Sequence, residues 1–191
     1  QGWSSSVQMS DKSDTRVVSF GAIANSTTSL TANILATINF NAASVLEDSH
    51  AGHVPASNWY RIPVSGYYDL DASVTLTNTT SEYQSTVRIQ IDSTGTGSSF
   101  SDIFQGVAAK ATSTASQNLQ VRTSGVKYLT GGSLVRVQAN STINNTVLSS
   151  ASISGTQLNI RRRSGPEAIA ATETIAVRAT NTAGTNIPNT G

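Results

Sequence analysis

The residues best suited to chemistry are two histidines that lie close together in a polar stretch of the sequence. His50 and His53 directly follow Glu47 and Asp48. A divalent metal ion would require such nitrogen and oxygen ligands to converge on one point. The stretch contains glycine and supplies no third fixed ligand, so we interpret it as a solvated surface loop. We therefore expect no metal ion and no cofactor.

Catalytic groups form no recognisable pattern. A Ser-His-Asp triad can be drawn on paper, but no Gly-x-Ser-x-Gly elbow supports it. A glycosidase needs two carboxylates that flank a bond in a cleft, whereas Asp69 and Asp71 are explained by the polar side of one strand. Residues 95–97 (Gly-Thr-Gly) lack the lysine and helix of a phosphate-binding loop. We predict that the protein is not an enzyme.

The aromatic residues suggest contact with a partner. Several of them cluster near the middle of the chain, and outward tyrosines favour subunit contacts or stacking against sugars. Packing in the core or between subunits is the interpretation we favour over contact with a ligand. The candidate ligand or subunit contacts are Trp59, Tyr60, Tyr67, Tyr68, His50 and His53.

These aromatic residues belong to a predicted hairpin at residues 59–76. Pro63 cannot donate a backbone hydrogen bond and Gly66 permits unusual backbone angles, so the turn is expected between them. From Leu70 to Leu76, apolar residues alternate with polar ones. Because side chains alternate across a strand, the sheet should have one buried face and one polar face.

The rest of the chain predicts further short strands. The same alternation occurs at 34–40, 87–92, 119–122 and 134–139, and Leu134 is expected on the outward side. Residues 42–58 predict a long surface loop and 94–99 a flexible tip. Eight to ten short strands separated by turns indicate an all-β, antiparallel two-sheet sandwich of the jelly-roll type.

Composition limits the classes of partner. The 191 residues carry a net charge of +1 and only 12% charged residues, so nothing favours a nucleic-acid partner. The absence of cysteine excludes disulfides and thiolate metal sites. No apolar run approaches the roughly 20 residues that cross a bilayer, so membrane insertion is not expected.

Three segments are predicted. Residues 1–14 form a polar lead-in, residues 15–163 the sandwich, and residues 164–191 a trailing segment after Ser164-Gly165-Pro166. The trailing segment is too short for its own core. It is either the start of a second, similar unit or an arm that adds a strand to a neighbour. Because the chain starts at Gln1, we expect a processed product or a piece of something longer.

Several motifs together resemble a known family. They are Ile38-Asn39-Phe40-Asn41 with Asp48, the 60–68 hairpin Tyr-Arg-Ile-Pro-Val-Ser-Gly-Tyr-Tyr, the 128–137 strand-turn-strand, and the closing 153–158 Ile-Ser-Gly-Thr-Gln-Leu. They resemble a C1q/TNF-like jelly roll of the kind found in bacteriophage structural proteins. Residues 2–10 and 164–170 resemble the linkers between tandem units of phage tail and virion proteins. Ser133 stands where that family usually has aspartate, which weakens any calcium-binding role.

The resemblance implies a symmetric homotrimer used for binding or assembly. The leading hypothesis is a tail-fibre or tail-associated module of a virion that binds a host surface glycan or receptor. The alternative is a capsid decoration protein that cements neighbouring shell proteins. A carbohydrate-active enzyme module is a third hypothesis from a different class. For the first two, the expected location is the virion, and the expected partners include other virion proteins.

Overall fold

The computed structural model describes residues 18–41, 44–112, 114, 117–148 and 155–163. The predicted lead-in (1–14), the trailing segment (164–191) and Ile153 lie outside the described residues. Within the described part, the chain forms antiparallel strands, with a turn of 3-10 helix at Pro55–Ser57. The prediction of an all-β sandwich is confirmed.

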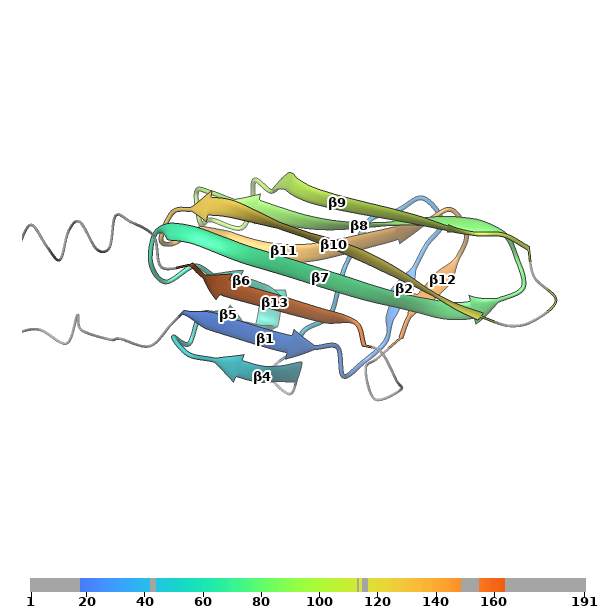
Figure 1. Cartoon of the computed structure of the whole chain (residues 1–191), viewed down its shortest axis with the longest axis horizontal. Coiled ribbons are helices and arrows are strands. Elements are labelled where there is room, and N and C mark those ends of the chain that lie inside the picture. Colours follow the sequence, from blue (N-terminus) through green and yellow to red (C-terminus); the bar gives the residue numbers. More distant parts are fainter. Residues whose placement is uncertain (1–17, 42–43, 113, 115–116, 149–154, 164–191) are drawn as a thin grey trace, which may run out of the picture.

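The strands form two sheets whose long strands run along the same axis of the molecule (Figure 1). Sheet I contains, in spatial order, β2 (Thr28–Leu30), β12 (Asn145–Val147), β7 (Gly66–Thr79), β13 (Gln157–Arg162), β1 (Ser19–Ile23) and β4 (Val45–Asp48), with β10 (Gln117–Leu129) on the other edge of β7. Sheet II contains β5 (His53–Val54), β6 (Trp59–Arg61), β11 (Leu134–Ser141), β8 (Tyr83–Asp92) and β9 (Ser101–Lys110), with β3 (Ala36–Thr37) also paired to β11.

The core lies between the two sheets and follows the predicted alternation. Along β7, Tyr68, Leu70, Ala72, Val74 and Leu76 are all buried. The facing strands of sheet II contribute their own alternate apolar residues, which are Val87, Ile89, Val135, Val137 and Ala139. Burial of these apolar side chains is the main force that holds the two sheets together.

Two turns meet at one end of the sandwich. The backbone N–H of Gly132 donates to the carbonyl of Ile62 at 2.7 Å, and Gly131 N–H donates to Ser65 Oγ at 2.9 Å. The first and last strands also lie together, because Arg162 N–H donates to the carbonyl of Val18 at 2.9 Å. The ends of the described sandwich are thus adjacent, at the left of Figure 1.

Three sequence-based expectations were wrong. Residues 42–58 are not a long loop, because β4 pairs with β1 and β5 pairs with β6. In 34–40 only β3 is a strand, although Ile38 and Phe40 are buried. Leu134 is fully buried, because its cross-strand partner Asp92 starts a loop that folds over this part of the sheet. Two-residue strands are too short for alternation to reveal them.

No helix in the described ranges is long and apolar enough to span a membrane.

Candidate binding surfaces

The two histidines serve the local fold and do not converge on one point. The carboxylate of Asp48 accepts hydrogen bonds from the backbone N–H groups of Gly52 and His53, at 3.0 and 2.9 Å. The Nε2 atom of His53 lies 2.7 Å from the carbonyl of Phe40, and His50 Nδ1 lies 2.7 Å from Ser49 Oγ. Among the described residues, no group of three or more acidic or histidine side chains is placed to hold a metal ion.

Tyr60 and Tyr68 are core residues, with only 1% and 0% of their surface exposed. The Tyr60 ring stacks on Phe20 with 4.5 Å between centroids. The Tyr68 hydroxyl donates to the carbonyl of Val64 at 2.6 Å, and burial raises the pKa of Tyr68 to about 12. Burial, and then the nearby Asp48, also raise the pKa of Tyr60. Neither ring is presented to a partner on the outer surface.

Tyr67 does reach the surface, on the outer face of sheet I. It is 49% exposed, and its cross-strand neighbour Tyr128 is 42% exposed. The two rings meet edge to face, with 5.3 Å between centroids and 75° between planes. Val126, two residues before Tyr128 on the same side of β10, is also 42% exposed. We call Tyr67, Val126 and Tyr128 the tyrosine patch.

Each aspartate beside the tyrosine patch is paired with an arginine. The carboxylate of Asp69 accepts a hydrogen bond from Arg163 Nε at 2.7 Å. The guanidinium of Arg122 donates from both Nε and Nη2 to the two carboxylate oxygens of Asp71. The two aspartates singled out in the sequence therefore each have an arginine partner on an exposed face. The same face also carries the exposed Arg161, which lies opposite Asp69 across β13 and β7.

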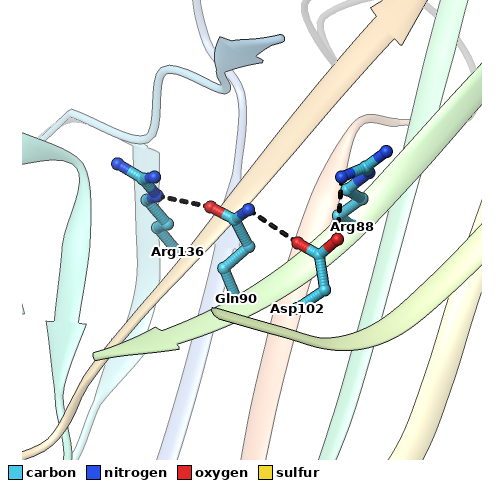
Figure 2. Close-up of polar contacts among 4 residues, drawn as sticks. All are labelled: Arg88, Gln90, Asp102 and Arg136. Atoms are coloured by element: carbon cyan, nitrogen blue, oxygen red, sulfur yellow. Dashed lines mark hydrogen bonds and ion pairs between the residues drawn. The ribbon is translucent and has the colours of Figure 1, made fainter. Parts of the chain in front are cut away.

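A second surface, on the outer face of sheet II, was not predicted from the sequence. Cross-strand pairing places Arg136 opposite Gln90, and Gln90 opposite Asp102, so their side chains form one row across β11, β8 and β9. Figure 2 shows how Arg88 extends this row. We call Arg136, Gln90, Asp102 and Arg88 the arginine row.

Hydrogen bonds connect the arginine row from end to end (Figure 2). Arg136 Nε donates to Gln90 Oε1 at 2.8 Å, and Gln90 Nε2 donates to Asp102 Oδ1 at 2.6 Å. Arg88 Nη1 then pairs with Asp102 Oδ2 at 2.7 Å. Arg88 thus contacts the carboxylate directly and Arg136 is connected to it through Gln90. With two guanidinium groups and one carboxylate, the row carries one excess positive charge.

Aromatic rings adjoin the arginine row. The guanidinium carbon of Arg136 lies 3.8 Å from the centre of the Phe100 ring. Phe100 in turn packs against the half-buried Trp59, with 5.4 Å between centroids. An arginine over an aromatic face is held by cation–π attraction.

The loop between β8 and β9 supports these rings, and it is not the flexible tip that the sequence suggested. The fully buried carboxylate of Asp92 accepts hydrogen bonds from the backbone N–H groups of Thr94, Gly97 and Ser98, at 2.9, 2.6 and 3.2 Å. These bonds, led by the hydroxyl of Thr94, lower the pKa of Asp92. Gly97 has φ +80° and contacts the Trp59 ring so closely that an added Cβ would overlap it.

A pocket of about 600 Å³ lies at the end of β8 and β9 that is remote from the loop on Asp92. It is lined by Glu82, Tyr83, Gln84, Ala109, Lys110, Ala111 and Thr142. None of the residues singled out in the sequence as candidate contacts lines it.

The comparisons with known proteins concern the fold. The chain is similar to murine APRIL in a crystal structure at pH 5.0, with a TM-score of 0.55 and 15% identity over 78% of this chain and 100% of that chain. It is also similar to Eiger TNF from S. frugiperda, with a TM-score of 0.59 and 6% identity over 78% of this chain and 93% of that chain. No protein-family model and no curated protein matches the sequence. The chain therefore has a TNF-like jelly-roll fold.

Proposed function

We propose that this chain is a non-enzymatic binding module that assembles as a homotrimer through the tyrosine patch. The observation that carries the proposal is the exposed edge-to-face pair of Tyr67 and Tyr128. Each large ring removes about 150–250 Å² of surface from water when it is buried, at about 25 cal/mol per Å² of apolar area. The paired charges beside them can stay solvated at the rim of such a contact.

The surface opposite this patch in the trimer is the seam between the two sheets, where β9 packs against β10. The two strands share no backbone ladder, but the backbone of Arg122 lies against Gly106 and the ring of Phe104 lies against Gly125, so the strands cover each other's edges. Val107 on β9 is 50% exposed beside this seam and offers apolar surface to a neighbouring subunit. Contact between two different surfaces on identical chains is heterologous, and it closes into a ring when the rotation allows.

The biological setting that we propose is a phage virion, with the trimer acting as a tail-fibre or tail-associated module that binds the host surface. The support is the resemblance of the hairpin and of the flanking linkers to phage structural proteins, together with the TNF-like fold. Three identical sites on one particle would gain avidity over each weak site alone. This gain would favour a receptor or glycan that is repeated across a cell surface.

Light scattering during size exclusion tests the assembly on the full chain. We expect a mass of three times the 19.9 kDa of the monomer. The double variant Tyr67→Ser/Tyr128→Ser should run as a folded monomer. The matched control is Ile34→Ser/Leu46→Ser, which removes two apolar side chains that are 58% and 70% exposed away from the patch. A monomeric parent chain, or a tyrosine variant that remains trimeric, would contradict the proposal.

Binding assays then test the proposed role in host attachment. A host-binding module should attach to bacterial cells of a susceptible strain, and excess unlabelled protein should compete with it. A decoration protein would instead bind empty capsid shells. Turnover of a glycan that stops when one aspartate is changed would show an enzyme and overturn the non-enzymatic assignment.

A further inference from the structure

The arginine row has its polar groups fixed before any partner arrives. The amide of Gln90 accepts from Arg136 on one side and donates to Asp102 on the other, so its orientation is determined. Arg88 holds the second oxygen of Asp102. A partner therefore meets groups whose rotamers are already ordered, which reduces the entropy cost of binding.

The terminal nitrogens of Arg136 remain available. Arg136 Nε donates to Gln90, and the face of the guanidinium packs on the Phe100 ring. Nη1 and Nη2 make no hydrogen bond to any described residue. Burial lowers the pKa of Arg136, while Asp102 opposes that shift. A partly desolvated guanidinium with a free pair of donors is suited to two parallel hydrogen bonds with a carboxylate.

Asp102 provides hydrogen-bond acceptors, whereas Arg136 provides donors. Its side chain is 36% exposed, and each of its oxygens uses one described hydrogen bond. A carboxylate has room for about four hydrogen bonds in all, so it can accept further donors such as sugar hydroxyls. Arg136 and Asp102 are thus an anion site and a hydroxyl site, separated only by Gln90.

Trp59 lies beside the anion site. Tyr60 pairs with Val135, so the next residues along β6 and β11 are Trp59 and Arg136. Both side chains also contact Phe100. The indole is half-buried, its N–H makes no hydrogen bond to a described residue, and Gly97 limits its movement. A partly exposed, immobilised indole is a platform for the apolar face of a sugar ring.

We propose that the arginine row and Trp59 bind an acidic saccharide. Its carboxylate pairs with the free nitrogens of Arg136, its hydroxyls donate to Asp102, and a ring packs on Trp59. This inference names the ligand class for the proposed binding function and rests on that function. It does not depend on the trimer, because all the groups belong to one chain and to the face of the sandwich away from the tyrosine patch.

Isothermal titration calorimetry on the full chain tests the inference. The probe is a hexasaccharide of alternating glucuronic acid and N-acetylglucosamine, and the reference is a neutral hexasaccharide of N-acetylglucosamine. We expect at least about tenfold tighter binding of the acidic probe, as charge-assisted hydrogen bonds contribute in other proteins. Arg136→Gln should remove this preference. Arg136→Lys keeps the charge but loses the planar fork, so it should also bind more weakly than the parent chain.

The matched control is Lys127→Gln, which removes one positive charge from an exposed side chain on sheet I and should leave affinity within about twofold. If Arg136→Gln does not fold, Arg136→Lys and Trp59→Phe carry the test. Equal binding of both probes, no binding at millimolar probe, an unchanged Arg136 variant, or equal binding of a single-stranded DNA oligomer would each overturn the inference. A monomeric parent chain that still prefers the acidic probe would contradict the trimer and leave this site standing.

Discussion

The two outer faces of the sandwich contain similar residues but are suited to different partners. Each has a pair of aromatic rings near the end where the first and last strands meet, and each has arginines bonded to aspartates. On sheet I, every one of these aspartates has its own arginine, and the rings of Tyr67 and Tyr128 are the groups left exposed. On sheet II, Asp102 bonds to Arg88 and to Gln90, Gln90 bonds to a second arginine, Arg136, and the Phe100 ring packs on the guanidinium of Arg136.

The two faces therefore differ in the kind of contact that each can still offer to a partner. On the face of sheet I both aspartates beside the tyrosine patch have an arginine partner, so an apolar partner can cover the rings without leaving either carboxylate unpaired. The face of sheet II keeps an arginine fork and a carboxylate with unused capacity, so a polar ligand gains more there than an apolar surface does. Burying an unpaired charge costs several kcal/mol. The first face is therefore suited to a sister subunit and the second to a charged ligand.

The largest effect should come from placing a charge in the tyrosine patch. Tyr128→Asp would bury an unpaired carboxylate at each of the three contacts, so we expect the dissociation constant of the trimer to rise at least about 100-fold. Light scattering over a dilution series measures this, and circular dichroism checks that the monomer is folded. Asn118→Asp, which adds the same charge to the exposed far end of β10, should stay trimeric. A trimeric Tyr128→Asp variant would show that the patch is not the contact.

The next largest effect should come from the loop that supports the sheet II face. Gly97→Ala combines a left-handed backbone with overlap of the new Cβ and Trp59, so we expect a loss of about 2–3 kcal/mol in the free energy of unfolding. Gly132→Ala is the control, because φ there is +91° but nothing lies within 4 Å of the new atom. It should cost about 1 kcal/mol. Urea unfolding at one protein concentration measures both.

The Gly97 variant also separates the two faces. Movement of Trp59 should weaken binding of the acidic hexasaccharide while the mass of the particle stays that of a trimer. Loss of assembly in this variant would mean that the faces are coupled.

The acid side of the stability profile should depend on Asp92. Its pKa is lowered in the folded state, so the unfolded chain binds a proton first as the pH falls. The stabilisation is fully present above the ordinary aspartate pKa of about 3.9 and declines below it. Asp92→Asn should lower the melting temperature at pH 7 and make its fall below pH 4 less steep. If the melting temperatures of the parent chain and of Asp92→Asn fell equally steeply below pH 4, this assignment would be contradicted.

The tyrosine patch could be partly predicted from sequence, because alternation fixes the side of each residue in a long strand. Leu70 to Leu76 places even positions of β7 inward, which makes Tyr68 buried and Tyr67 exposed. Tyr60 lies in a three-residue strand, where alternation gives no such signal. The partner of Tyr67 could not be predicted, because Tyr128 lies opposite it only through the register of β10 on β7.

The arginine row could not have been found from the sequence. Its members come from three strands, and a register shift between Ile89 and Gln90 changes which residues face each other across β8 and β9. The loop bonded to Asp92 covers the same end of the sheet. Alternation alone would place Asp92 on the exposed outer face. A buried carboxylate that accepts several backbone bonds is a tertiary feature, and the surrounding Thr, Gly and Ser read simply as a turn.

The smallest effect should come from comparing one arginine-bonded aspartate on each face, Asp71 on sheet I and Asp102 on sheet II. Asp71→Ala breaks a contact with Arg122, whose side chain is 66% exposed, and such pairs contribute little because water screens them. We expect no measurable change in the melting temperature. Asp102→Ala removes the acceptor for both Gln90 and Arg88, so it should cost about 1–2 kcal/mol and weaken saccharide binding. Equal effects of the two substitutions would mean that the charges of the two faces are balanced in the same way, and the reason for assigning them different partners would be lost.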